Sequence, residues 1–448
     1  MNADLVLRGA TLLTVNDAEP LVEDGVIAIC GDRLAFVGPA SAAPPTLAAT
    51  RTLDVRGRVI TPGFVNVHTH AILTMARGKA EDMGFAPAYT PGVPKGSDVG
   101  VDEAIALARL GALEALIFGS ALINDTYVHA AATVAPMAEV GVRVTTCGRI
   151  HDVDFTVVAD GRWEHDERIG TRTLDEALAL AEAWHGKADG RIGVQLSPHA
   201  VDTCSYALLR RVAEASWQFA LRVNTHLAQS QIEVERVRAR SGRSPAEVLD
   251  AAGLLNDRLI AAHCIFLSEQ DIARVGKAAV TVAHVPKGNA TGGMVAPTPK
   301  LRRAGARLAL GTDNMHADMI EVMRWALAIA RIQEGRATED WQPEDALRMA
   351  TLEGARAMGL EADLGSLVAG KKADLVVVDF RRPHLTPCTS ALGNLVHTAQ
   401  GRDVEMVIVD GRVVVEDGRP TLVDEDAIRR EAAAAARALW QRVGRLRR

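Results

Sequence analysis

The chain has 448 residues, of which 48% are hydrophobic and 24% charged, and its formal net charge is −6. This composition is typical of a globular protein with a sizeable core, and the length predicts one large domain plus a smaller one. The acidic balance, without a long basic block, argues against a nucleic-acid partner. No apolar stretch is long enough to span a membrane, and no signal-peptide pattern is recognised. Five cysteines without a C-x-x-C pair predict reduced thiols and a cytoplasmic protein.

The two ends of the chain share one texture. Residues 1–57 contain short alternating strands separated by turns, and "ADLVVVDF" and "VEMVIVDGRVVVEDGRP" repeat this pattern in residues 368–424. We therefore expect a small composite β-sandwich formed by both termini. The Ala-rich segment 425–448 is predicted to be a helix that docks on the protein or lies at an oligomer contact.

The middle of the chain, residues 58–367, alternates short Val/Ile/Leu/Ala runs with longer helical patterns. Strands that are apolar throughout predict parallel pairing with both faces covered by helices. The eight predicted strands end near His70, Asp125, Ile150, Pro198, Leu227, Ile265, Pro286 and Asn314. The α/β fold predicted is thus a (β/α)8 TIM barrel. A doubly wound sheet is the alternative, but it favours a glycine-rich phosphate loop after the first strand, where this chain has "HTHAILTMARG". After the barrel, "WQPEDALRMATLEGARAMGL" predicts a single helix that starts near Pro343 and ends at Gly359.

Polar side chains recur at the carboxyl ends of the predicted strands. His68 and His70 share one face of the first strand, because side chains alternate with period two. Later strands end in the same manner, with His226, His263, His284 and Asp313. Each histidine alone is explained equally well as a satisfied core residue, but the carboxyl ends of barrel strands meet at one mouth. The recurrence therefore predicts a shared site.

A set of imidazoles with one carboxylate and no thiolate suits zinc or ferrous iron with an open position for water. The fourth strand, "RIGVQLSPH", has no lysine that could bridge two metals, which favours one divalent ion, with zinc preferred. Such an ion lowers the pKa of a water molecule toward neutrality. Asp313 could bind the ion and take the proton, while His263 orients the water. This machinery adds hydroxide to an electrophilic sp2 carbon.

The chain resembles the amidohydrolase superfamily, in the branch of triazine hydrolases, guanine deaminase and S-adenosylhomocysteine deaminase. The motifs that carry the resemblance cover nearly the whole chain and are "TPGFVNVHTH", "ARG", "SPHAVDTCS", "THLAQS", "AHCIFLS", "AHVPKGN", "LGTDN" and "GSLVAGKKADLVVVD". The resemblance implies metal ligands at His68, His70, His226 and Asp313. It implies a water-orienting His263, a substrate contact at His199, the composite sandwich, and an oligomer, often a dimer.

One departure from the family pattern bears on the reaction. Deaminases of the family carry a glutamate three residues after the strand-five histidine, whereas this chain has Gln229. A glutamine forms hydrogen bonds but does not shuttle a proton. The predicted function is hydrolysis of a non-peptide C–N bond in a small nitrogen-containing molecule, with a heterocycle preferred. The alternatives are amide or urea hydrolysis or dehalogenation at the same centre, and a non-catalytic scaffold.

Further residues near the predicted mouth are candidates for substrate contact. They are Arg149, His284, Asn289, Asn314 and His316. His316 is also a candidate for the missing acid. The Gly- and Pro-rich segment 79–100 after the first strand has the length and composition of a lid.

Overall fold

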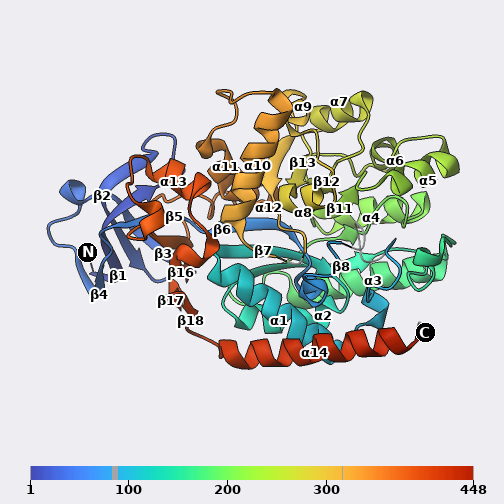
Figure 1. The fold of residues 1–448 in the computed structure, drawn as a ribbon, viewed down its shortest axis with the longest axis horizontal. Helices are drawn as coiled ribbons and strands as arrows, with labels where there is room; N and C mark the ends of the chain where they lie inside the picture. The colour runs from blue at the N-terminus through green and yellow to red at the C-terminus, as the bar shows by residue number, and fades with distance from the viewer. Residues whose placement is uncertain (1, 83–88, 315, 447–448) are drawn as a thin grey trace.

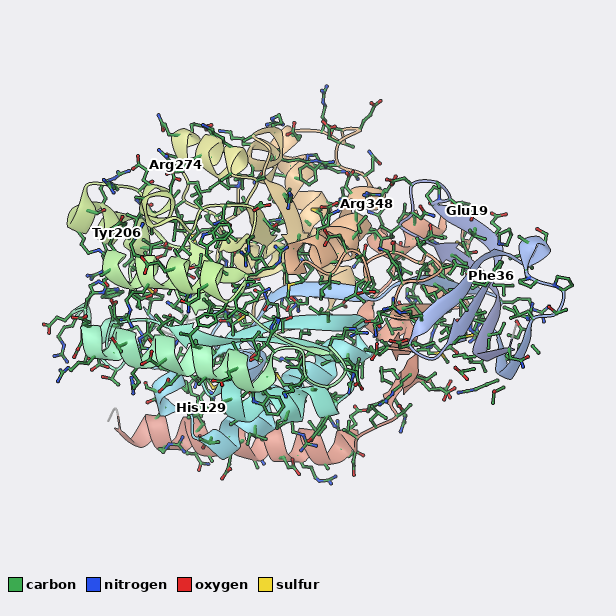
Figure 2. All side chains as sticks on the ribbon, turned by 180° about the vertical axis from the view of Figure 1, so that it is seen from behind. Glu19, Phe36, His129, Tyr206, Arg274 and Arg348 are labelled. Atoms are coloured by element: carbon green, nitrogen blue, oxygen red, sulfur yellow. The ribbon has the colours of Figure 1, made fainter. Side chains whose placement is uncertain are left out.

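The computed structural model describes residues 2–82, 89–314 and 316–446. A small β-rich part lies at one end of the molecule and a larger part with mixed strands and helices at the other (Figure 1). Seen from behind, Phe36 and Glu19 mark the β-rich end, and Tyr206 lies at the opposite end (Figure 2). Residues 83–88 of the predicted lid lie outside the described residues, so the lid stays a prediction.

The larger part is built around two parallel sheets. The first contains β6 (Phe64–Thr69), β7 (Ser120–Tyr127), β8 (Arg143–Ile150), β9 (Ile192–Val194) and β10 (Ser197–Pro198); the second contains β11 (Val223–Leu227), β12 (Leu259–His263), β13 (Thr281–His284) and β14 (Arg307–Leu310). Parallel bridges from Thr69 to Asp313 and from Leu196 to Val223 join the sheets along both edges. With β9 and β10 taken as halves of one strand, the described strands form a ring of eight. The predicted (β/α)8 barrel is therefore confirmed.

Helices surround this ring, which explains why its strands are buried along nearly their whole length. They are α1 (Val101–Ile117), α2 (Ala130–Glu139), α3 (Glu167–Trp184), α4 (Tyr206–Gln218), α5 (Gln231–Ser241), α6 (Pro245–Ala252), α7 (Glu269–Lys277), α8 (Pro286–Thr291), α9 (Thr298–Arg303) and α10 (Met319–Glu334). Ser230, Ser244 and Ser268 each accept a hydrogen bond from a backbone N–H in the first turn of α5, α6 and α7. These serines define where the helices begin.

The single helix predicted around 343–359 is wrong. The segment forms α11 (Pro343–Ala350) and α12 (Leu352–Met358), separated at Thr351, whose φ is −131°. Beyond the break, Ala355 and Met358 pack with inward residues of several barrel strands. The change of direction thus lets α12 contribute to the barrel interior, which helix propensity alone does not reveal.

Strands from both ends of the chain form one nine-stranded sheet among the described residues. It contains β1 (Asn2–Leu13), β2 (Leu21–Cys30), β3 (Arg33–Pro39), β4 (Ala48–Asp54), β5 (Arg58–Pro62), β15 (Leu375–Asp379), β16 (Val404–Val409), β17 (Arg412–Glu416) and β18 (Arg419–Pro420). β5 joins the two ends, because it pairs parallel with β1 and antiparallel with β15. Leu7, Ile60 and Leu375 belong to one apolar cluster. The predicted domain limits at 57, 367 and 424 stay predictions.

Two features attach the remaining parts to the barrel. Arg143 of β8 donates hydrogen bonds to Asp374 and Asp410 from a buried position between the barrel and the nine-stranded sheet. The helix α14 (Glu425–Leu446) runs along α1 (Figure 1), and its Trp440 Nε1 donates to the carbonyl of Met75 at 2.8 Å. This helix is therefore docked within the chain.

Short elements complete the structure. They are α13 (Ala391–His397) and the 3-10 helices η1 (Ala40–Ala42), η2 (Ala71–Ala76), η4 (Gly96–Asp98), η5 (Val158–Asp160), η6 (Pro383–Leu385) and η7 (Gly401–Asp403). Across the described ranges, we find no helix with the length and hydropathy needed to cross a lipid bilayer.

Candidate active site

The first and last barrel strands come close together at their carboxyl ends. The backbone N–H of Asp313 donates to the carbonyl of His68 at 3.0 Å, and the N–H of His70 donates to the carbonyl of Asp313 at 2.7 Å. Gly311 permits this approach, because a Cβ atom there would lie 2.8 Å from the His68 carbonyl oxygen. The closure of the barrel thus brings the predicted first and last ligands together.

Five of the predicted residues form one buried cluster. Ligand atoms of His68, His70 and His226 lie within 4.8 Å of one another, as do those of His68, His263 and Asp313. His70 Nε2 lies 3.3 Å from both Asp313 Oδ1 and His226 Nε2. The rings of His226 and His263 are stacked, with centroids 5.4 Å apart. Segments separated by up to 245 positions in sequence therefore meet at one point, as the strand pattern predicted.

Three of these histidines are oriented by contacts on their Nδ1 atoms. His70 Nδ1 lies against the carbonyl of Thr126, and His226 Nδ1 lies 2.6 Å from the carbonyl of His199. His263 Nδ1 lies 3.0 Å from Oδ1 of Asn289. Because a carbonyl oxygen accepts, Nδ1 of His70 and of His226 carries the proton and Nε2 keeps its lone pair. This is the arrangement that orients metal-binding histidines.

His68 provides the test of whether the cluster suits a metal. Its ring is fully buried, and neither ring nitrogen has a hydrogen-bond partner among the described residues. Burial, followed by the neighbouring His70 and His226 rings, holds the His68 pKa well below its usual value, so the ring is neutral. Buried polar groups without partners are costly. A cation at the centre of the cluster would satisfy this ring, and the donor set of nitrogens with one carboxylate suits zinc.

The histidine–aspartate cluster also contains an ionised carboxylate and two residues with strained backbone angles. Burial opposes ionisation of Asp313, but the adjacent rings of His70, His263 and His68 hold its pKa well below the usual range. His263 and Asp313 both adopt positive φ angles, 73° and 65°. Non-glycine residues in this region store strain, and such residues gather at functional sites.

A cavity of about 570 Å³ is lined by residues from the ends of β7 and β8 and from α2 and α3, and none of the five cluster residues is in its lining; it is linked to the cluster by the ring of Tyr127, which lies 5.7 Å from that of His70. Its lining includes the predicted Arg149, whose guanidinium stacks 4.0 Å from the Phe155 ring. Burial lowers the Arg149 pKa, and among the described residues its Nε has no hydrogen-bond partner and its guanidinium no ion pair. The predicted His199 reaches the same region, since its ring contacts both Phe155 and His226 at 4.9 Å. Arg149 and His199 therefore lie near one another, with Phe155 between the cavity and the cluster, and their contact with substrate stays a prediction.

The structure also places the other predicted residues near the cluster. Gln229 is buried in the loop after β11, and its backbone N–H donates to Glu233 at 2.9 Å. His284 is buried at the end of β13, and within the described ranges neither of its ring nitrogens has a partner. Asn289 contacts His263. Asn314 and His316 line a second cavity, which also contains Asp313. The roles of all these residues stay predictions.

The sequence analysis missed the aromatic residues at the mouth. The ring of Tyr127 lies 5.7 Å from that of His70, and Arg149 lies between Tyr127 and Phe155. Tyr127 ends β7, so an aromatic residue at the carboxyl end of a barrel strand was an available signal. Phe155 follows β8 in a loop, where the sequence carries no such signal.

A closed parallel barrel with a buried histidine–aspartate cluster at its carboxyl mouth defines the class of metal-assisted barrel hydrolases. The amidohydrolase family model matches residues 59–414. The chain belongs to the amidohydrolase family.

Relatives along nearly the whole chain have names that refer to deaminases. The 5-methylthioadenosine/S-adenosylhomocysteine deaminase of Moorella thermoacetica is 35% identical over 95% of this chain and 97% of its own length. The 5'-deoxyadenosine deaminase of Methanosarcina acetivorans is 31% identical over 98% of this chain and 99% of its own.

Solved structures agree with the fold. An adenosine deaminase from Xanthomonas campestris with bound zinc has a TM-score of 0.87 at 28% identity, covering 99% of both chains. The zinc complex of atrazine chlorohydrolase from Arthrobacter aurescens has a TM-score of 0.87 at 24% identity, covering 96% of this chain and all of that one, and supports the fold alone. Family and relatives together make this chain a hydrolase of carbon–nitrogen bonds, with a histidine cluster able to hold a metal.

Proposed function

We propose that the chain hydrolyses the exocyclic amine of an adenosine derivative, with one zinc ion held by His68, His70, His226 and Asp313. The observation that carries the proposal is the buried ring of His68, which has no hydrogen-bond partner in the described part of the chain and lies where the other ligands converge. The relatives named for 5-methylthioadenosine, S-adenosylhomocysteine and 5'-deoxyadenosine support this substrate class.

When bound, the metal supplies an acidified water and a Lewis acid at the reacting carbon. His263 accepts a hydrogen bond at Nε2 and so orients the attacking water, with Asn289 fixing the ring through Nδ1. Asp313 keeps its carboxylate ionised and takes the proton of that water. In this assignment Asn289 acts as a positioning residue for His263, beyond its predicted contact with substrate.

The first cavity holds the organic part of the substrate. Its volume of about 570 Å³ is within the range of small-molecule sites, and the rings of Tyr127 and Phe155 offer stacking surfaces. Arg149 has unused donors for a ring nitrogen or oxygen of the substrate. Thr203 donates its hydroxyl proton to Ala200, so His199 Nδ1 donates to Thr203, and Nε2 of His199 accepts from the substrate.

Gln229 supports a second candidate function. Its amide orients a substrate ring but supplies no proton to a ring nitrogen. Hydrolysis of an amide, a urea or a carbon–halogen bond does not require a proton at that position. We therefore keep this alternative, with His284, Asn314 and His316 as further substrate contacts in either case.

The test is a product screen with zinc-loaded protein. Wild type should release ammonia from 5'-methylthioadenosine or S-adenosylhomocysteine, and Gln229→Glu should raise kcat by about 10²-fold, the lower end of general acid catalysis. Gln231→Glu, an exposed change at the first residue of α5, is the matched control and should alter kcat less than twofold. Turnover of ureas or halogenated triazines, with no ammonia from either nucleoside, would replace the proposal with the alternative.

Four assignments accompany the proposal. The strands of residues 1–57 and 368–424, joined by β5, form a two-layered β-sandwich next to the barrel of residues 58–367 and the helix of residues 425–448. Support comes from the apolar cluster that unites both ends. The protein is a cytoplasmic dimer, with a small molecule rather than a nucleic acid or membrane as its partner. Size-exclusion chromatography with light scattering tests the dimer.

A further inference from the structure

His68 differs from the other histidines of the cluster in how it is held. Their rings are oriented by contacts at Nδ1, whereas neither ring nitrogen of His68 has a hydrogen-bond partner among the described residues. The His68 ring meets the rings of His70 and His226 edge to face, with centroids 4.8 and 4.9 Å away. Its position therefore depends on the backbone that carries it.

The backbone before His68 lies in an irregular part of β6. The register between β6 and β7 is interrupted between Asn66 and Thr69. On the other side, an isolated bridge from Thr69 to Asp313 connects β6 with the segment after β14. The peptide group that joins Val67 to His68 falls within the interruption. Regular pairing with β7 thus stops at the peptide that precedes the ligand.

Three asparagine side chains bind this peptide group. Asn124 Nδ2 donates to the Val67 carbonyl at 2.9 Å, and Asn224 Nδ2 donates to the same oxygen at 3.4 Å. At the other end, Asn66 Oδ1 accepts from the His68 N–H at 3.4 Å. All three side chains are fully buried, and they come from β6, β7 and β11. We call Asn66, Asn124 and Asn224 the carboxamide cradle.

Asn66 connects the cradle to the last barrel strand as well. Its Nδ2 donates to Thr312 Oγ1 at 2.8 Å, and its Oδ1 accepts from the Thr312 N–H at 3.2 Å. Thr312 directly precedes Asp313 in the chain. A single side chain therefore contacts the backbone beside two of the proposed ligands, His68 and Asp313.

The two donors to the Val67 carbonyl differ in their own support. Asn124 donates its second hydrogen to Gln195 Oε1 at 3.2 Å, and its Oδ1 accepts from the Cys147 thiol at 3.2 Å. Asn224 Oδ1, in contrast, has no partner in the described part of the chain. Buried acceptors without partners are costly. Asn224 thus retains an unfavourable carbonyl in exchange for its contact with the peptide before His68.

We propose that the carboxamide cradle positions His68, by holding the Val67–His68 peptide so that the ring faces the centre of the cluster before a metal binds. The inference rests on the metal site of the proposed function and adds three positioning residues to it. A carboxamide suits this task, because it offers both a donor and an acceptor to a peptide group and brings no charge beside the cluster.

The cradle can be tested without turnover, by competition for zinc with a chromogenic chelator and by the visible absorption of bound cobalt(II), whose band shape reports ligand geometry. We expect Asn124→Leu to weaken zinc binding at least about tenfold and to alter the cobalt band, as for other changes that disturb ligand orientation. Asn224→Leu removes the longer contact and should weaken zinc binding about threefold. Because it also removes the partnerless Oδ1, urea denaturation of its metal-free form should show no loss of stability.

Ser216→Ala is the matched control. Ser216 Oγ donates to the Leu221 carbonyl at 2.6 Å from a buried position near the amino end of β11, so the change removes a similar bond away from the cluster. It should change zinc affinity less than about twofold and leave the cobalt band as in wild type.

Wild-type zinc affinity or a wild-type cobalt band in folded Asn124→Leu would overturn the cradle, as would an equal loss of zinc affinity in Ser216→Ala. Should Asn124→Leu fail to fold, the same two measurements on Asn224→Leu decide. Wild type that binds no zinc would overturn the proposed function together with this inference. Zinc binding by wild type with unaffected variants would overturn this inference alone.

Discussion

Gly311→Ala tests whether the close approach of the first and last strands builds the metal site. The new Cβ would lie 2.8 Å from the His68 carbonyl oxygen and 2.9 Å from its Cβ, against ordinary contacts that begin at 3.4 Å. The strands must therefore separate by about 0.6 Å, and overpacking of this kind costs about 1–3 kcal/mol of stability. Because His68 and Asp313 move apart with their strands, we expect zinc affinity to fall by about 10–100-fold, as for changes that disturb ligand orientation.

The assay is competition for zinc with a chromogenic chelator, together with urea denaturation of the metal-free protein. Gly148→Ala is the matched control: this glycine lies in β8, and its Cβ would be 3.5 Å from the nearest atom, an ordinary contact. Should Gly311→Ala bind zinc as tightly as Gly148→Ala, the ligand cluster would not depend on the contact between β6 and β14. The reasoning from barrel closure would then be refuted.

Three further outcomes are expected. His68→Asn should reduce bound zinc to below about a tenth of the wild-type content by elemental analysis, because the change removes a ligand; retained zinc would contradict the cluster. Arg143→Met should lower the free energy of unfolding by about 3–5 kcal/mol, measured by urea denaturation, since it leaves Asp374 buried without its cation; a loss below about 1 kcal/mol would contradict this. Burial raises the pKa of Asp202 from 3.8 to about 6, so the native state binds the extra proton and wild-type stability falls as pH rises from 4 through 6. Asp202→Asn should therefore gain on the order of 3 kcal/mol relative to wild type at pH 8 and much less at pH 4, and a gain independent of pH would refute the assignment.

The barrel and its cluster could be predicted because both depend on regular features of the chain. In a parallel barrel the carboxyl ends of all strands lie at the same mouth. The position of a histidine at the end of a strand can therefore be predicted without knowledge of any loop. His68, His226 and His263 were located in this way. Sequence spacing also predicted the strand ends at Ile150, Pro198 and Leu227, where the structure has them.

Features that depend on side-chain packing escaped prediction. The helix break at Thr351 follows from the fit of α12 inside the barrel, while the local sequence favours one continuous helix. The contacts of Arg149 with the rings of Tyr127 and Phe155 join a strand end to a loop whose path has no periodic pattern. Tertiary contacts decide such details, so they appear only in the structure.

The two cavities have opposite chemistry, and this bears on how a substrate must lie. The first offers aromatic rings and the Arg149 guanidinium, whose Nε has no partner among the described residues, whereas the second offers paired ions together with Glu81 and His316. A substrate that enters both must cross the cluster, because Tyr127 of the first cavity neighbours His70 and the second contains Asp313. A compact, uncharged heterocycle fills only the first cavity. Selectivity should therefore depend more on the substituent that reaches past Asp313 than on the ring that is hydrolysed.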